Sequence, residues 1–338
     1  MRLALAAGLA AALTVGVTAA AGNSSHGIPR SFEPDAAAAV GTRDLWVLGG
    51  RVLLRSTDAG QHFTRVASPP LQPQGPPPRL EFANARDGFS YVLDSGPLYV
   101  THDGGSSWHR AGPAGNVLAF SVGGGDVYVA VGHVLERSPV GRSAWRKLGV
   151  SVPRRPVSLA ARGSSVWFLG PPRHRPDFNT IALSSDRGRT FGARKGPCLS
   201  ELGGTLVPAG GGTVWAICPS GTMAWLTLST NDGRSFSIRS FHDPGGARQP
   251  ALINSARIAA ASRRLAVLSR GGGGSLLRTT DAGRHWTRVA GTSHVDEIFW
   301  LAFTTRRVGA ALVQTSARTT KLWRTHDGGA TWHSVPIR

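Results

Sequence analysis

The octapeptide STDAGQHF, residues 56–63, returns five more times along the chain, as THDGGSSW (101–108), SSDRGRTF (184–191), STNDGRSF (229–236), TTDAGRHW (279–286) and THDGGATW (325–332). The third positions of these copies fall at 58, 103, 186, 231, 281 and 327, so that the gaps are 45, 83, 45, 50 and 46 residues. The gap of 83 contains a degenerate copy, SPVGRSAW (138–145), which keeps a serine, a glycine and the tryptophan but has lost the aspartate. Seven units of about 45 residues therefore fill most of the chain, and this period is typical of propeller blades.

Each unit contains short strand-like runs around its octapeptide. In the fifth unit these are GTLVPAG (204–210), TVWAICP (213–219), AWLTLST (224–230) and, after the octapeptide begins, SFSIRSF (235–241). Runs of β-branched and aromatic residues separated by glycine-rich turns are typical of antiparallel strands. The sequence therefore predicts an all-β fold, a seven-bladed β-propeller of four-stranded antiparallel blades that occupies residues 22–338 as a single domain.

The octapeptide has a structural explanation as the hairpin between the third and fourth strands of a blade. Its aspartate can accept hydrogen bonds from backbone N–H groups of the turn, and its glycine can adopt the positive φ that a bulged hairpin requires. The terminal aromatic ring is expected to point between the sheets, where its burial stabilises the fold by about 2–3 kcal/mol. We assign this structural role to the third position of each complete copy: Asp58, Asp103, Asp186, Asn231, Asp281 and Asp327.

These octapeptides resemble the Asp-box, or BNR, repeats of the sialidase-like propellers. The family includes sialidases, sortilin-type receptors, some glucanases and the photosystem II assembly factors, and the last are similar to this chain in blade count. The resemblance covers nearly all of the chain after residue 21. It implies the fold rather than an activity, because function on such folds depends on sites added to the blades.

The N-terminus has the pattern of a secretory signal peptide over residues 1–21. Arg2 precedes an apolar run from Leu3 to about Val17, and small residues follow up to Gly22. The apolar run is shorter than the ~20 residues of a membrane span, although an uncleaved anchor stays an alternative. We therefore expect a secreted or cell-envelope protein with no membrane span after removal of the signal.

The only two cysteines are expected to form one disulfide. Cys198 is placed at the start of the first strand of blade 5 and Cys218 at the end of the second, so that antiparallel pairing would bring them together. A single pair of cysteines in an exported protein favours a structural bridge.

The chain carries a formal net charge of +19, with 38 Lys+Arg against 19 Asp+Glu, which favours anionic partners. If the Asp-boxes lie on one face, the long loops between blades lie on the other, and guanidinium groups there can bind carboxylate, sulfate or phosphate. The alternative is that these are solvated loop charges. The candidate ligand-binding rim comprises Arg79, Arg154, Arg155, Arg173, Arg175, Arg194, Lys195, Arg248 and Arg318.

We interpret the chain as a monomeric binding or scaffold module for an anionic glycan, a cell-wall polymer or an acidic protein surface. The 11 histidines are scattered, so no metal or cofactor is expected, and export argues against a specific nucleic-acid partner. The alternative is a sialidase-like exo-acting glycoside hydrolase, which would need a Tyr–Glu pair or two carboxylates. The three tyrosines fall inside expected strands, and the weak catalytic candidates, which can instead neutralise arginines, are Asp177, Asp243, Asp296 and Glu297.

Overall fold

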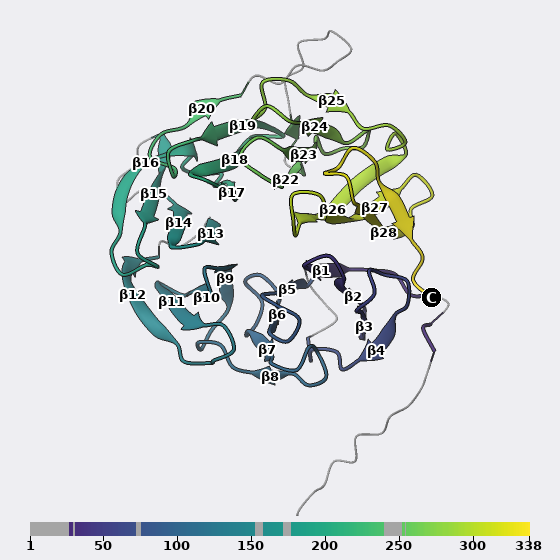
Figure 1. The fold of residues 1–338 in the computed structure, drawn as a ribbon. Helices are drawn as coiled ribbons and strands as arrows, with labels where there is room; N and C mark the ends of the chain where they lie inside the picture. Colours follow the sequence, from purple (N-terminus) through teal and green to yellow (C-terminus); the bar gives the residue numbers. More distant parts are fainter. Residues whose placement is uncertain are drawn as a thin grey trace, which may run out of the picture.

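A computed structural model describes residues 27–29, 31–71, 76–152, 158–171, 177–239, 252–253 and 255–338. These residues form seven antiparallel sheets, which stand in a ring around a central axis (Figure 1). The first strand of each sheet lies innermost and the fourth outermost. The seven-bladed propeller of four-stranded blades is therefore confirmed. The expected signal peptide, residues 1–21, lies outside the described residues.

Each blade uses consecutive strands of the chain. Blades 1 to 4 contain β1 (Ala36–Val40), β2 (Asp44–Gly49), β3 (Val52–Ser56) and β4 (Thr64–Val66); β5 (Arg79–Phe82), β6 (Gly88–Tyr91), β7 (Tyr99–Thr101) and β8 (His109–Arg110); β9 (Val117–Gly123), β10 (Asp126–Val131), β11 (Val134–Pro139) and β12 (Arg146–Ser151); β13 (Ser158–Arg162), β14 (Ser165–Gly170), β15 (Phe178–Ser184) and β16 (Gly192–Leu199).

Blades 5 to 7 follow the same order. They contain β17 (Thr205–Gly210), β18 (Thr213–Ser220), β19 (Met223–Ser229) and β20 (Ser237–Ile238), with the short β21 (Leu252–Ile253) also paired to β19; β22 (Arg257–Ala260), β23 (Ala266–Ser269), β24 (Leu277–Thr279) and β25 (Thr287–Arg288); β26 (Val295–Phe303), β27 (Gly309–Thr315), β28 (Thr320–Thr325) and β29 (His333–Val335). The described residues contain no helix that is long and apolar enough to cross a membrane.

The hydrophobic core lies between neighbouring blades, and the Asp-box aromatics fill it as the sequence predicts. Trp286 of blade 6, for example, is 4% exposed and meets the buried Trp215 of blade 5 with ring centroids 6.1 Å apart. Phe63 packs in the seam between blades 1 and 7, and Trp145 of the degenerate box packs between blades 2 and 3. The degenerate box thus keeps its packing function without its aspartate.

The hydrogen bonds of the boxes confirm that their aspartates are structural. In blade 4, Ser184 Oγ donates to Asp186 Oδ1 at 2.7 Å and accepts the N–H of Gly188 at 2.8 Å. Thr190 donates its N–H to Asp186 Oδ1 at 3.0 Å and its hydroxyl to Oδ2 at 2.6 Å. These bonds hold the pKa of Asp186 far below its usual range, and the two bonds from Thr190 contribute most to this shift.

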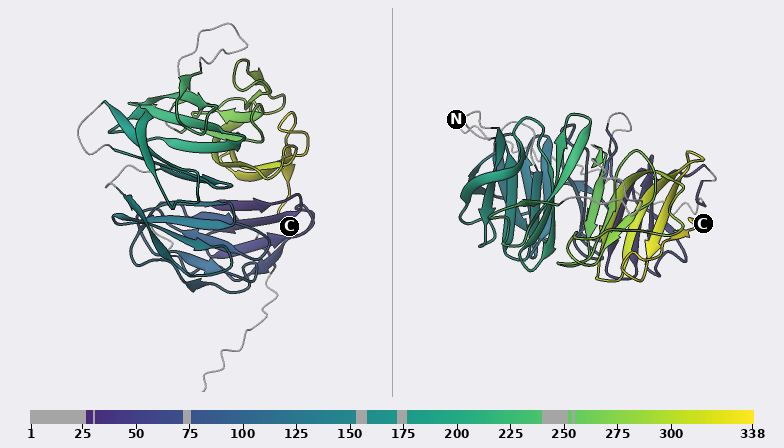
Figure 2. Two further views of the ribbon diagram at one scale, coloured as in Figure 1. Left: turned by 60° about the vertical axis from the view of Figure 1, so that its left-hand side comes forward. Right: turned by 90° about the horizontal axis from the view of Figure 1, so that it is seen from above.

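The boxes also tie each blade together and to its neighbour. The residue after each Asp-box aspartate or asparagine has a positive φ, such as 71° at Ala59, and donates its N–H to the turn between the first two strands of its own blade. In five blades its carbonyl accepts a bond from the preceding blade, as Gly104 does from Trp46 Nε1 at 2.9 Å. In the other four bonds a side chain donates to the carbonyl of a box residue: Arg137 to Arg187, Trp167 to Asp232, Arg278 to Gly328 and Arg324 to Ala59. The boxes consequently all lie on one face of the disc, which Figure 2 shows edge-on.

The expected disulfide joins Cys198 and Cys218, whose Cα atoms are 4.9 Å apart. Its position differs from the sequence prediction in one respect, because Cys198 lies near the end of β16 in blade 4 instead of in blade 5. The side chain of Asn179 accepts the N–H of Cys198 at 3.2 Å, and β16 stays paired to β15 as far as Leu199. The bridge therefore links two blades.

Candidate functional site

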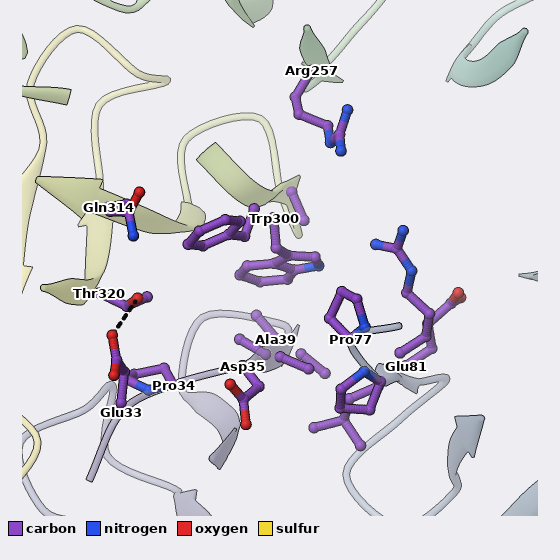
Figure 3. Close-up of a pocket in the computed structure, with 18 of the residues that line it drawn as sticks. Glu33, Pro34, Asp35, Ala39, Pro77, Glu81, Arg257, Trp300, Gln314 and Thr320 are labelled. Atoms are coloured by element: carbon purple, nitrogen blue, oxygen red, sulfur yellow. Dashed lines mark hydrogen bonds between the residues drawn. The ribbon is translucent and has the colours of Figure 1, made fainter. Parts of the chain in front are cut away.

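A cavity of about 770 Å³ opens at the axis on the face opposite the Asp-boxes (Figure 3). Its walls come from the segment 33–39 of blade 1, the segment 77–82 of blade 2, Arg257 of blade 6 and several residues of blade 7. Blades 7 and 1 form the seam where the end of the chain meets its beginning, and blades 2 and 6 flank them. The cavity is therefore a property of the closed ring.

The innermost strands explain why space remains at this place. β1 contributes a run of alanines, whose small side chains leave room at the axis. β26 has irregular register between Val295 and Glu297 and between Ile298 and Trp300. Such bulges re-aim side chains, and Phe299 and Trp300 both line the cavity instead of alternating in and out. Figure 3 shows the Trp300 indole in the middle of this space.

The acidic side of the cavity belongs to blade 1. Glu33 Oε1 accepts a hydrogen bond from the Thr320 hydroxyl of blade 7 at 3.4 Å. Asp35 Oδ2 accepts the N–H of Gly50 at 2.7 Å. Both carboxylates are exposed yet oriented by these bonds, so they form a fixed negative wall.

The basic side consists of Arg79 on β5 and Arg257 on β22. Burial lowers the pKa of Arg257, the positive charge of Arg79 lowers it further, and Glu297 opposes the shift. The two guanidinium charges therefore repel one another. Among the described residues neither forms an ion pair within 4.0 Å. Arg257 Nη1 donates to the carbonyls of Ser255 and Ala256 at 3.1 and 3.0 Å, and Figure 3 shows this guanidinium beside the open space. Glu81 interacts with Arg79, and Glu297 with Arg257, without a contact within 4.0 Å, so a ligand anion can approach the two guanidinium groups more closely than these carboxylates do.

Glu81 and Tyr91 form a further pair beside the cavity. The Tyr91 hydroxyl donates to Glu81 Oε1 at 3.0 Å. Burial raises the pKa of Glu81 to about 7, although the bond from Tyr91 and the charge of Arg79 both lower it. Burial, followed by the charge of Glu81, raises the pKa of Tyr91 well above its ordinary value. Tyr91 is only 4% exposed and packs on Phe120 between blades 2 and 3, so its hydroxyl, which is bonded to the cavity-lining Glu81, is buried.

The structure places the residues singled out from the sequence at several different sites. Arg79 and Glu297 line the axial cavity. Arg194 and Lys195 lie with Asp177 at the outer strands of blade 4, where the Lys195 ammonium sits 4.0 Å from the centre of the Phe178 ring. Arg318 is exposed in the turn between β27 and β28, and Asp296 is exposed on β26. The remaining candidates lie outside the described residues: Arg154, Arg155, Arg173, Arg175, Arg248 and Asp243.

Several cavity residues were missed by the reasoning from sequence, notably Glu33, Asp35, Arg257 and Trp300. A usable signal was present at Arg257, since a charged residue that opens an innermost strand, as Arg79 also does, must face the axis or the neighbouring blade. The exposure of Trp300 had no such signal, because it depends on the irregular register of β26.

Comparison with known proteins agrees with this architecture. No family model matches the chain. The chain is similar in sequence to the chloroplastic photosystem II stability/assembly factor HCF136 of Oryza sativa subsp. japonica, with 25% identity over 269 residues, which is 72% of this chain and 56% of that protein. It is an Asp-box propeller related to that assembly factor. This propeller thus spans little more than half the length of its relative.

Solved structures share the fold of this Asp-box propeller with little sequence identity. YCF48 bound to a D1 peptide superposes with a TM-score of 0.58 and 16% identity, covering 89% of this chain and 95% of that chain. A puromycin hydrolase gives a TM-score of 0.59 and 16% identity, covering 91% of this chain and 54% of that chain. At such identities only the fold is shared, and this fold serves both assembly factors and hydrolases.

Proposed function

We propose that this propeller is a binding module for a protein partner and that its axial cavity binds an extended, acidic segment of that partner. The observation that carries the proposal is the pair Arg79 and Arg257, two guanidinium groups that face one cavity without an ion-pair partner among the described residues. A carboxylate can take a bidentate hydrogen bond from a guanidinium group, and such bonds strengthen where water is excluded.

The opposite wall of the cavity gives the ligand a direction. Glu33 and Asp35 repel an acidic group and attract an amine, whereas Phe299 and Trp300 offer flat apolar surfaces between the two charged sides. An extended peptide meets all three demands, with its acidic side chain or terminus toward blades 2 and 6. The relationship to an assembly factor and the fold shared with a peptide-bound YCF48 support a protein partner over a glycan or a cell-wall polymer.

We further propose that the protein acts outside the cytoplasm. The signal-like residues 1–21 and the bridge between Cys198 and Cys218 support export, because disulfides persist in oxidising compartments.

The second candidate function is an exo-acting glycoside hydrolase, which is favoured by the four carboxyl groups of Glu33, Asp35, Glu81 and Glu297 at one cavity. The sialidase form of this alternative is weakened by Tyr91, whose hydroxyl is buried between blades instead of open to a substrate. No tyrosine is among the described residues that line the cavity.

The test is a binding measurement with a fluorescein-labelled hexaglutamate peptide and, in parallel, an oligogalacturonate of equal charge. The variant Arg79→Met/Arg257→Met is expected to bind the peptide at least about tenfold more weakly, which corresponds to ~1.4 kcal/mol. The control Arg194→Met/Lys195→Met removes the same charge on blade 4 and should change affinity by less than about threefold.

Equal losses in the two variants would refute the cavity as the binding site. Tighter binding of the oligogalacturonate would replace the protein partner by an acidic glycan. Hydrolysis of fluorogenic sialosides or glucosides that disappears in Glu297→Gln would establish the enzyme alternative instead.

A further inference from the structure

The turns between the first and second strands gather on the Asp-box face at the other end of the axis. In every blade the carbonyl of such a turn accepts the N–H of a box residue, which fixes the turn beside its box. Four blades carry arginine in this turn, and in blade 4 an arginine ends β13 directly before it. These arginines are Arg43, Arg86, Arg162, Arg263, Arg264, Arg306 and Arg307. None of these arginines belongs to the rim that the sequence predicts on the opposite face.

Three of these arginines line a single cavity of about 380 Å³, which we call the box-face mouth. Arg162 comes from blade 4, Arg263 from blade 6 and Arg306 from blade 7. Between them lies the blade 5 turn at Gly210 and Gly211, where both residues have a positive φ. The side chains of Arg162 and Arg263 lie so close to these two glycines that a Cβ atom there would contact them. Arg162 Nη1 donates to the Pro208 carbonyl at 3.3 Å, so this side chain leans toward the glycine turn.

The positive charge of the box-face mouth is not neutralised locally. Among the described residues that line it there is no carboxylate, and none of its three arginines forms an ion pair within 4.0 Å of a described partner. All three arginines are exposed.

The acids of the neighbouring turns are engaged elsewhere. Asp44 lies 3.6 Å from Arg55, Asp87 bonds to His102 at 2.7 Å, and Asp126 lies 3.9 Å from both Arg137 and Arg187. The Asp-box aspartates accept the N–H groups of their own hairpins, as Asp281 does from His285. These acids therefore do not neutralise the three arginines of the box-face mouth.

We propose that the box-face mouth binds the phosphate groups of a linear phosphate polymer. A carboxylate offers two oxygens and is saturated by one guanidinium fork, whereas a phosphate group offers more acceptors and can bridge forks from different blades. The glycine turn lets the Arg162 and Arg263 side chains approach its backbone closely, which brings cations of blades 4 and 6 toward one place. The volume exceeds that of one phosphate group, which favours a chain over a free ion.

This site is separate from the axial cavity and does not depend on the proposed function. It lies on the other face, and it contains no acidic wall among the described residues.

The proposal is tested by fluorescence anisotropy of the full chain with end-labelled inorganic polyphosphate and with a poly(glycerol phosphate), at about 0.15 M salt, where long-range charge effects are screened. The variant Arg162→Gln/Arg263→Gln/Arg306→Gln should bind at least about tenfold more weakly. The matched control Arg189→Gln/Arg234→Gln/Arg284→Gln removes three exposed arginines of the outer box hairpins and should lose no more than about twofold.

Because Arg162 bonds to Pro208, the double variant Arg263→Gln/Arg306→Gln accompanies the triple one and keeps that bond. Binding of either polymer that weakens in the inner variants and not in the outer control supports the proposal, and binding of neither polymer overturns it. The relative affinities of the two polymers show whether a phosphoanhydride chain or a phosphodiester chain is preferred. If the box-face mouth variants and the outer hairpin control lose equal affinity, the binding is diffuse electrostatic attraction and the proposal is overturned. Competition by hexaglutamate as strong as by polyphosphate would overturn the choice of phosphate.

Discussion

Replacing Arg324 with methionine tests how the ring of blades is closed. Every blade is built from consecutive strands, so blade 7 meets blade 1 through side chains and not through a shared strand. Arg324 lies in β28, is 3% exposed, and donates from Nη1 to the Ala59 carbonyl and from Nη2 to the Thr42 carbonyl at 2.8 Å. Both acceptors belong to blade 1.

The magnitude follows from those two bonds. Hydrogen bonds from a charged donor contribute about 1.5–3 kcal/mol each, or about 3–6 kcal/mol together. Burial of the guanidinium opposes this gain, as the lowered pKa of Arg324 shows, and its removal relieves that cost. Methionine keeps most of the apolar stem. We expect Arg324→Met to lower the free energy of unfolding by about 2–4 kcal/mol.

The matched control is Arg278→Met at the same position of blade 6. Arg278 makes one such bond, from Nε to the Gly328 carbonyl at 2.8 Å, and is only partly buried. We therefore expect Arg278→Met to lower the free energy of unfolding by about 1–2 kcal/mol. Guanidinium-induced unfolding followed by tryptophan fluorescence gives both values, provided the slope stays constant. If Arg324→Met costs no more than Arg278→Met, polar contacts at the seam do not govern closure, and the reasoning fails.

Three further predictions concern the boxes, the bridge and the cavity. Asp327→Ala should lower the free energy of unfolding by about 1–3 kcal/mol, because N–H groups of its turn lose their acceptor. Asp327→Asn should lower it clearly less, because Asn231 already makes the corresponding bonds in blade 5. Thermal unfolding of both variants checks this order. Changing both Cys198 and Cys218 to alanine should cost about 2–4 kcal/mol, and a reducing agent should lower the melting temperature of the parent protein but not of this variant. The carboxyl of Glu81 holds its proton to about pH 7 in the folded protein but only to its ordinary value of 4.5 when unfolded, so stability should fall as pH rises through that window, and Glu81→Gln should flatten the curve.

The repeats made the blade count predictable, whereas the cavity depended on details that no short sequence window contains. A box every 45 residues or so fixes where the third strand ends, and the hydrogen bonds of Asp186 follow from its neighbours in the same octapeptide. Arg79 and Arg257 are 178 positions apart, and they share a cavity because the ring closes between blades 7 and 1. The end of blade 4 was misplaced for a similar reason, since Asn179 extends β16 beyond the apparent break before Cys198.

The net charge of +19 overstates the cations that can serve binding, because part of them is structural. Arg137, Arg278 and Arg324 occupy the same place before a box and bond to carbonyls of the next blade, and Arg55 reaches the Ala85 carbonyl in blade 2. Arg79 and Arg257 at one end of the axis, and the arginines of the box-face mouth at the other, line cavities without an ion pair within 4.0 Å among the described residues. A ligand-binding assay that varies total charge alone will therefore confuse ring stability with recognition. Paired variants that keep the number of charges constant and move only their position separate the two effects, since a structural arginine changes unfolding and a recognition arginine changes affinity.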